Sequence, residues 1–273
     1  MNENKTNINW YPGHMAKTKR LIKENINLID VVYEVIDSRI PYSSKIVDID
    51  DLIKNKERVL IFNKYDLCDK EETNKWVNYY KNLGYKVVTT NLNDLNSIKD
   101  VLKITKKIDN RRTRILIVGV PNVGKSTLIN RLVGKKAVNV GNKPGITKSV
   151  NWIRINENFE LMDTPGILWP KFEDKVAFNL ASFRAIKEEV LPISKVVCYI
   201  LDTLLKYYPN ILKERYNLTE IDEDYIEAYE TIGKKRGCLV KGCTVDYEKV
   251  NSIVMNDINE YIKGVTFDRY ENR

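Results

Sequence analysis

Two nucleotide-binding motifs occur in this chain in an order that restricts how it can fold. The N-K-x-D tetrapeptide at residues 63–66 comes first, and the glycine-rich octapeptide G-x-x-x-x-G-K-S at residues 119–126 comes later. A D-x-x-G tetrapeptide at residues 163–166 follows both. In a conventional domain with these motifs, the glycine-rich loop leads and the N-K-x-D element closes the series. If all of them serve one pocket, the fold is circularly permuted.

The hydrophobic pattern places the motifs on alternating strands and helices. β-branched-rich runs such as residues 31–36 and 59–62 are typical of buried parallel strands. The full series that we expect has strands at 31–36, 59–62, 87–90, 115–118, 152–155 and 159–162, the last two as a hairpin, and helices at 14–29, 70–83, 98–108 and 127–133. This alternation predicts an α/β domain with a mostly parallel sheet and helices on both faces.

After about residue 172 the pattern becomes helical only. Helical periodicity occupies residues 176–190, 193–208, 222–234 and 247–262. We therefore expect two domains: residues 1–172 hold a basic arm and the permuted nucleotide-binding domain, and residues 173–273 form a small all-helical domain.

Charge and composition indicate a cytoplasmic protein with an anionic partner. The 273 residues carry a net charge of +8; residues 1–172 have 30 Lys and Arg against 19 Asp and Glu, whereas residues 173–273 have 15 against 18. The basic excess therefore lies in the nucleotide-binding part. Four cysteines without C-x-x-C spacing and a single histidine disfavour a zinc site. We find no signal-peptide core, membrane span or lipidation motif.

The glycine-rich loop has the context that phosphate binding requires, since it follows a strand and opens a helix. Gly119 and Gly124 permit a tight turn in which backbone amides face phosphate oxygens at a helix N-terminus. Lys125 is expected to bridge the β- and γ-phosphates, and Ser126 to ligate magnesium. The amides that we assign to the phosphates belong to Asn122, Val123, Gly124, Lys125, Ser126 and Thr127.

The D-x-x-G segment and the loop before it supply further candidates. Asp163 ends a strand, which suits a magnesium carboxylate, and the Gly166 amide can reach a γ-phosphate. Thr147, in the loop Pro144-Gly145-Ile146-Thr147, offers a hydroxyl for the same magnesium ion. An ordinary loop threonine is the alternative.

The N-K-x-D element indicates guanine rather than adenine. A carboxylate at Asp66 accepts from the N1–H and 2-amino group of guanine, whereas adenine leaves it unpaired. The stem of Lys64 can cover the base, and Asn63 completes the element. The sequence therefore predicts GTP and GDP as ligands.

No glutamine follows the D-x-x-G segment to orient a hydrolytic water, because Ile167 stands there. We expect slow hydrolysis by the free protein and acceleration by a partner. The only histidine, His14, lies between an aromatic Pro-Gly turn and a basic helix, where an imidazole can orient or deprotonate water. A turn histidine that packs locally or contacts RNA is the alternative.

With these motifs in place, the chain closely resembles the circularly permuted GTPases of the ribosome biogenesis GTPase A family. The resemblance covers nearly the whole chain and rests on residues 10–20, 63–66, 119–132, 144–147 and 163–172, and on the tail at 232–238. It implies a monomeric factor that binds the maturing large ribosomal subunit and its ribosomal RNA. It also implies a late step of assembly, with GTP hydrolysis stimulated by that particle.

The resemblance also implies particular residue roles. It favours His14 as a participant in hydrolysis, and Asn122 as a ligand for potassium beside the magnesium site. Asn91 and Leu92 fall where the family's remaining base-contacting loop lies, although this chain lacks the usual small-residue pattern there. Two basic clusters, Arg111–Arg112–Arg114 and Lys234–Lys235–Arg236, are candidates for RNA phosphates, with solvated charge as the alternative.

Two other functions remain open from the sequence. One is a nucleotide-switched RNA-binding module with little catalysis of its own, for which Ile167 would mark a degenerate catalyst. The other is a GTPase that signals at a membrane, against which the absence of a lipidation motif and of an amphipathic membrane helix argues.

Overall fold

The computed structural model describes residues 13–53, 56–136, 151–168, 172–218 and 224–272. Its centre is a six-stranded sheet in the order β3-β2-β1-β4-β6-β5, in which only β5 runs antiparallel to its neighbour. The strands are β1 (Val31–Asp37), β2 (Glu57–Asn63), β3 (Lys86–Thr89), β4 (Thr113–Val118), β5 (Asn151–Arg154) and β6 (Phe159–Asp163). The mostly parallel α/β sheet predicted from the sequence is confirmed, including the hairpin of its last two strands.

Alternating residues of the central strands face two helical layers. Ile36, Leu60 and Phe62 pack against Trp76 and Tyr80 on one face. On the opposite face, the hydroxyl of Tyr33 donates to the carbonyl of Val101 at 3.1 Å. The helices of this half are α1 (Gly13–Asn25), α2 (Asp50–Ile53), α3 (Lys70–Asn82), α4 (Leu95–Lys103) and α5 (Lys125–Val133), with short 3-10 turns η1 (Ile26–Leu28) and η2 (Val47–Ile49). Helices cover both faces, as expected.

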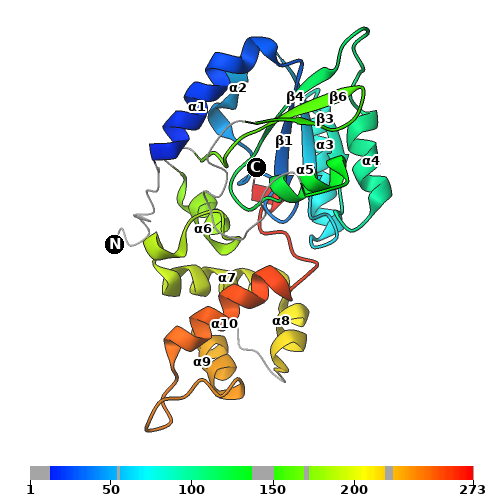
Figure 1. Cartoon of the computed structure of the whole chain (residues 1–273). Helices are drawn as coiled ribbons and strands as arrows, with labels where there is room; N and C mark the ends of the chain where they lie inside the picture. The colour runs from blue at the N-terminus through cyan, green and yellow to red at the C-terminus, as the bar shows by residue number, and fades with distance from the viewer. Residues whose placement is uncertain (1–12, 54–55, 137–150, 169–171, 219–223, 273) are drawn as a thin grey trace.

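Beyond β6 the chain is helical, and this part is called the helical half (Figure 1). It contains α6 (Asp174–Ser182), η3 (Glu188–Val190), α7 (Ile193–Tyr207), α8 (Pro209–Tyr216), α9 (Tyr225–Lys235) and α10 (Tyr247–Glu260). Helix α7 packs against α6, α8, α9 and α10, so it forms the centre of this group. Its face carries Val196, Val197, Ile200, Leu201 and Leu204, all fully buried.

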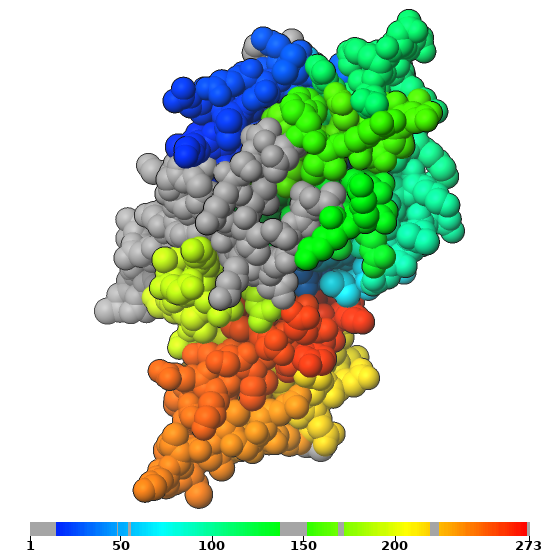
Figure 2. All heavy atoms as spheres, viewed as in Figure 1, coloured from blue at the N-terminus to red at the C-terminus, as the bar shows by residue number. Residues whose placement is uncertain are grey.

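The last residues return to the sheet-bearing half. After α10, residues 261–272 run back along α3 and end in the 3-10 turn η4 (Tyr270–Asn272), which Figure 1 shows in red. The carboxylate of Asp268 accepts hydrogen bonds from the amides of Tyr42 and Ser43 at 2.8 and 2.7 Å, and from the side chain of Asn179 at 2.8 Å. The space-filling view shows the two halves in contact over these red residues (Figure 2). One buried carboxylate thus joins the sheet half to α6.

Several helices differ from the sequence prediction, among them the short α2, which was not predicted. Helix α4 covers residues 95–103 rather than 98–108, because Asp94 caps its start by accepting from the amide of Asn96. Helix α6 ends at Ser182 rather than near residue 190, because Arg184 adopts a positive φ of 57° and the amide of Ala185 bonds back to Leu180. Helix α8 was not predicted, although Pro209 at its first turn is a favourable start.

The helices of the described residues are too short or too polar to cross a membrane.

Candidate nucleotide-binding site

The three motifs meet at the carboxyl edge of the sheet. Asn63 is the last residue of β2, Asp163 is the last residue of β6, and the glycine-rich loop leaves β4 after Val118. Since β1 lies between β2 and β4, and β6 adjoins β4, all of these strand ends occupy one edge. In open parallel sheets, ligands bind in the crevice at this edge.

The N-K-x-D element touches the glycine-rich loop directly. The side-chain amide of Asn63 donates to the carbonyl of Val123 at 2.6 Å, and the Lys64 ammonium donates to the carbonyl of Asn122 at 2.7 Å. The hydroxyl of Thr90 donates to the Asn63 amide oxygen at 3.1 Å, which fixes the orientation of that amide. Motifs far apart in the sequence therefore build one continuous site, which is the arrangement that a circular permutation requires.

Close packing explains two of the glycines. Gly124 has a φ of +97°, and a Cβ placed on it would lie 2.2 Å from the Asn63 amide nitrogen. A Cβ on Gly166 would lie 2.9 Å from backbone atoms of Pro121. The glycine-rich loop therefore needs glycine where it approaches Asn63, and the D-x-x-G segment needs glycine where it approaches Pro121.

The start of α5 is built to receive an anion. Gly124 is its N-cap and provides no side-chain cap, so the first amides of the helix lack an intrahelical partner. The Lys125 ammonium is buried and donates to the carbonyls of Gly119 and Val120 at 3.0 and 3.1 Å. Burial lowers the pKa of Lys125 to about 8, although the nearby Asp163 carboxylate opposes this shift. A phosphate group would give the Lys125 ammonium a negatively charged partner in addition to these two neutral carbonyls.

Asp163 has the character of a cation ligand. Both carboxylate oxygens are buried and have no hydrogen-bond partner among the residues that the structure describes. Burial raises the pKa of Asp163 to about 6, against the opposing charge of Lys125. An oxygen-liganded Mg²⁺ held by Asp163 and the Ser126 hydroxyl fits this donor set. Within the same described ranges, no group of three or more His, Cys, Asp or Glu side chains could hold a metal by itself.

The remaining predicted residues fall into two groups. Asp66 is exposed, as a carboxylate that reads a base must be before the ligand arrives, and Asn91 and Leu92 are half-buried. The Leu92 Cδ1 atom lies 3.6 Å from the position of a Cβ on Gly124, so this loop borders the glycine-rich loop. Thr147 lies outside the described residues. His14 lies in the first turn of α1, and its side chain is also outside the described part.

Ile167 is fully buried, and its amide donates to the carbonyl of Gly119 at 3.1 Å. Its side chain therefore packs in the core and has no polar atom for a water molecule. Leu168 beside it is buried too.

Four residues at the site are not predicted by any motif. Thr90 orients Asn63, and Asp37 bonds Lys64 at 2.8 Å. Arg39 holds Asp37, and the carbonyl of Arg184 accepts from the Asn122 side chain at 2.5 Å. For Asp37, the available signal is its place at the end of a buried strand, in register with Asn63. No local pattern marks Arg184, because its contact comes from the helical half.

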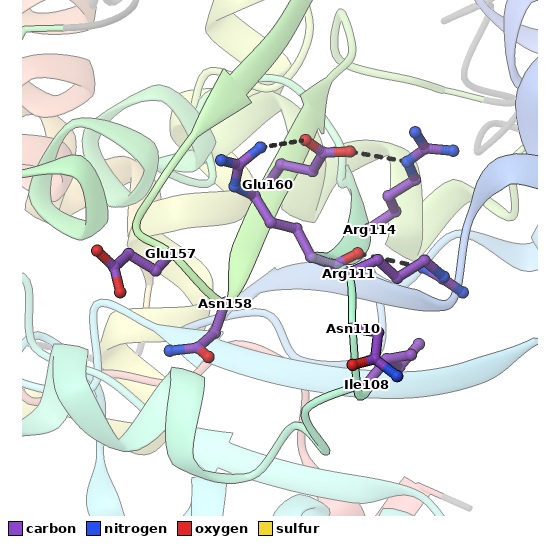
Figure 3. Close-up of a pocket in the computed structure, with 8 residues that line it drawn as sticks. Ile108, Asn110, Arg111, Arg114, Glu157, Asn158 and Glu160 are labelled. Carbon is purple, nitrogen blue, oxygen red and sulfur yellow. Dashed lines mark hydrogen bonds and ion pairs between the residues drawn. The ribbon is translucent and has the colours of Figure 1, made fainter.

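The basic linker lies at the opposite edge of the sheet. A hollow of about 610 Å³ is lined there by Arg111, Arg112 and Arg114 together with acidic and amide side chains (Figure 3). Arg111 forms two bonds with Asp30 at 2.6 and 2.7 Å, and Glu160 pairs with Arg114 at 2.7 Å and with Arg112 at 3.7 Å. The linker charges are thus largely engaged within the fold.

Comparison with known proteins identifies the family. A family model described as 50S ribosome-binding GTPase matches residues 114–241, and one described as RsgA GTPase matches residues 52–173. A ribosome biogenesis GTPase A of Priestia megaterium is 44% identical over 277 residues, which cover 96% of each chain. That of Bacillus cereus is 43% identical and covers 92% of this chain and 90% of the relative.

Solved structures agree with this result. GNP-bound YlqF from T. maritima has 30% sequence identity and a TM-score of 0.68, with 93% of this chain and 98% of that chain covered. A GDP-bound YlqF structure gives 29% identity and a TM-score of 0.69, with coverage of 92% and 100%. A permuted phosphate-loop site, full-length relatives and a matching fold lead to one conclusion: the chain belongs to the ribosome biogenesis GTPase A family and is a GTPase of ribosome assembly.

Proposed function

We propose that this chain binds GTP and GDP where the N-K-x-D element meets the glycine-rich loop. Asn63, Lys64 and Asp66 hold the guanine base, and Asn91 and Leu92 border it. Lys125, Gly166 and the amides of residues 122–127 hold the phosphates. The observation that carries this assignment is the pair of bonds from Asn63 and Lys64 to the carbonyls of Val123 and Asn122.

Magnesium would be held by Ser126 and Asp163, with Thr147 as a further ligand that depends on the nucleotide state. The bound ion would offset negative charge on the β- and γ-phosphates. The orphaned Asp163 carboxylate supports this assignment. Lys125 adds a second positive charge at the same phosphates, and it is already held by two carbonyls of the loop.

Hydrolysis by this chain is slow until a partner completes the site. The residue after the D-x-x-G segment cannot hold water, because the Ile167 side chain is apolar and buried in the core. His14, at the start of α1, would orient or deprotonate the attacking water. The histidine would act only once the partner has fixed the N-terminal arm over the phosphates.

The proposed partner is the maturing large ribosomal subunit, with ribosomal RNA as the contacted surface and a late assembly step as the setting. The family model that matches residues 114–241, described as 50S ribosome-binding GTPase, supports this choice. The basic excess of residues 1–172 and the helical unit of residues 173–273 would make the contacts. The protein would act as a monomer in the cytoplasm, where bacterial subunits assemble.

The decisive experiment compares GTP turnover alone, with purified large subunits and with small subunits as the control particle. We expect large subunits to raise turnover at least about tenfold, small subunits to leave it unchanged, and His14→Ala to abolish the stimulation. Sedimentation of the same particles with a GTP analogue, with GDP and without nucleotide tests whether binding follows the nucleotide. Nucleotide-dependent binding without stimulated turnover would instead establish an RNA-binding switch with little catalysis.

We also propose potassium as a second cation, held by the Asn122 side-chain oxygen. The Asn122 amide nitrogen donates to the Arg184 carbonyl, and the side-chain oxygen is the atom of this amide with the chemistry to ligate a cation. Turnover in KCl should exceed turnover in NaCl at equal ionic strength, and Asn122→Ala should remove the difference. Equal rates in the two salts would exclude this cation.

A further inference from the structure

A buried charged cluster lies beside the proposed base site and belongs to none of its motifs. It consists of Asp37, Arg39 and Lys64. Asp37 and Arg39 are 2% and 1% exposed. The Arg39 guanidinium donates to both oxygens of the Asp37 carboxylate, at 3.0 and 2.9 Å. Asp37 ends β1, the strand between β2 and β4, so its carboxylate lies between the base-reading and phosphate-binding elements.

The same carboxylate holds Lys64. The Lys64 ammonium donates to the Asp37 Oδ2 atom at 2.8 Å and to the Asn122 carbonyl at 2.7 Å. Lys64 has a φ of 59°, a left-handed conformation that a lysine adopts only under constraint. Two acceptors on two different elements therefore fix the ammonium, and only one of them belongs to the glycine-rich loop.

The cluster keeps Asp37 charged inside the protein. Burial alone would raise the pKa of this carboxyl group, but the positive charges and hydrogen bonds of Arg39 and Lys64 hold that pKa well below its usual range. Conversely, burial lowers the pKa of Lys64 and the Asp37 charge opposes that effect. Removing the carboxylate would leave the buried Arg39 guanidinium and the partly buried Lys64 ammonium without their counter-ion.

The far side of the cluster is formed by the helical half. Arg39 also donates to the carbonyl of Ile258, in α10, at 3.3 Å, and its guanidinium lies 4.2 Å from the centre of the Phe183 ring. The Arg39 carbonyl accepts from the amide of Phe267 at 2.8 Å. Arg39 is therefore surrounded by residues that reach it from the end of α6, from α10 and from the returning segment.

We propose that Asp37 is a positioning residue for guanine-nucleotide binding, which holds Lys64 against the glycine-rich loop, and that Arg39 makes this hold depend on the helical half. The inference rests on the nucleotide site proposed above. It gives a physical route by which nucleotide at the sheet edge and the position of α10 influence each other. The link in this route is the set of hydrogen bonds that Arg39 makes to both Asp37 and Ile258.

A second buried ion pair on the same strands supplies a matched control. Glu34, also on β1 and fully buried, accepts from Arg58 of β2 and from the amide of Ile46 at 2.6 Å. Glu34 is the middle residue of β1 and Arg58 lies near the start of β2; among the described residues, the hydrogen bonds and ion pairs of these two side chains go to each other, Ile46 and Asp50, and none goes to a residue of the proposed site. Loss of the Glu34 charge should therefore lower the free energy of unfolding without changing nucleotide affinity.

The first test measures GDP and GTP dissociation constants for the full chain, for Asp37→Asn and for Glu34→Gln. Unfolding curves recorded in parallel confirm that each variant is folded under the binding conditions. We expect Asp37→Asn to weaken both nucleotides by about tenfold or more, the scale of one charge-assisted hydrogen bond, and Glu34→Gln to change them by less than about twofold. Equal affinities for the two variants at equal stability would overturn the positioning role of Asp37.

The second test concerns Arg39 and uses backbone hydrogen exchange of residues 255–262. In the unmodified chain, GDP should slow exchange in this segment of α10. Arg39→Met, which keeps an unbranched apolar stem but removes the hydrogen bonds to Asp37 and Ile258, should abolish the slowing, and Arg39→Lys should retain part of it. Undiminished slowing in Arg39→Met would show that α10 does not depend on Arg39. Arg39→Lys also replaces Arg39→Met if the latter does not fold.

Asp66→Ala separates failure of this inference from failure of the proposed site. If the unmodified chain does not bind guanine nucleotides, or if Asp66→Ala binds them equally well, the site itself is wrong. If Asp66→Ala loses binding while Asp37→Asn matches Glu34→Gln, only the role of Asp37 is wrong.

Discussion

At the scale of single residues, backbone conformations and side chains converge where the two nucleotide elements touch. Lys64 and Asn122 both adopt positive φ values, 59° and 61°, a left-handed conformation that is unfavourable for lysine and that asparagine tolerates. The Lys64 ammonium bonds the Asn122 carbonyl, so each unusual conformation serves the contact with the other. Local strain of this kind is typical of functional sites. The contact should therefore form in the absence of ligand and present a preorganised pocket.

Asp66 tests base recognition at this scale. Asp66→Asn replaces a double acceptor by an amide that also donates, which suits the 2-oxo group of xanthine rather than the 2-amino group of guanine. We expect GTP affinity to fall by about a hundredfold and XTP affinity to rise, as measured by competition binding. Asp100→Asn, an exposed carboxylate on α4, should leave both affinities unchanged. An unaltered preference for GTP in Asp66→Asn would contradict the proposed base contact.

Asp37 gives a pH dependence whose sign follows from its lowered pKa. A carboxyl group with a folded-state pKa below its unfolded value stabilises the fold above the unfolded pKa of 3.8, and this stabilisation is lost as pH falls through the folded value. The free energy of unfolding should thus be larger for the unmodified chain than for Asp37→Asn at pH 7. The difference should narrow as pH drops below about 4. Urea unfolding at stepped pH measures it, and a constant difference would falsify the assignment.

At the scale of elements, strands and motifs are readable from the sequence, whereas helix ends and long-range contacts are not. The buried strands have continuous apolar runs, and the glycine-rich loop has a strand before it and a helix after it, so both are locally encoded. Helix α6 ends because Arg184 takes a left-handed conformation. The sequence gives no sign of this, since the residue is neither glycine nor asparagine. The return of residues 261–272 to α3 depends on contacts with residues far away in the sequence, and no local sequence pattern predicts such contacts.

The candidate site divides in the same way. The order of the motifs predicts that Asn63 and the glycine-rich loop share one pocket, and the contact of Asn63 with Val123 agrees with it. The roles of Asp37 and Arg39 require knowledge of which strands are neighbours and of where α10 lies. The parts of His14 and Thr147 remain predictions, since they depend on atoms outside the described residues.

The returning segment can be tested through Asp268. Asp268→Ala removes the acceptor for the amides of Tyr42 and Ser43 and for the Asn179 side chain, all within the interior. Buried donors left unpaired should lower the free energy of unfolding by about 2–4 kcal/mol. Asp100→Ala, which removes an exposed carboxylate paired with Lys103, should lower it by less than about 0.5 kcal/mol. Urea unfolding checks both values, and similar losses would show that Asp268 does not join the two halves.

At the scale of the whole molecule, charge that looks alike in the sequence has different surroundings in the fold. The linker arginines pair with Asp30 and Glu160 at the amino end of the sheet. Lys234 and Lys235, at the end of α9, are exposed; Lys234 pairs with the half-buried Glu230 at 3.5 Å, and the Lys235 ammonium donates to the carbonyl of Asn217. Phosphate binding draws on cations that can exchange water for phosphate, so the two clusters should differ in function.

This contrast predicts opposite outcomes for two double variants. Arg111→Gln with Arg114→Gln should lower the urea midpoint of unfolding slightly and leave sedimentation with large subunits unchanged. Lys234→Gln with Lys235→Gln should barely change stability, but weaken sedimentation several-fold and reduce its dependence on salt. The measurement is sedimentation at two salt concentrations beside urea unfolding. Loss of particle binding in the arginine variant alone would reverse the assignment.

The hydrogen bonds of the Asp268 carboxylate also affect the order in which parts of the protein can fold during synthesis. A ribosome releases a chain from its N-terminus, so the segment around Tyr42 and Ser43 emerges long before its acceptor, which is 225 residues further along for Ser43. Those amides must remain hydrated or find temporary partners until translation has passed residue 268. The sheet half therefore gains these hydrogen bonds only after residue 268 has been added and has left the ribosome, and a product truncated before it should bind GTP less tightly even though every nucleotide motif is present.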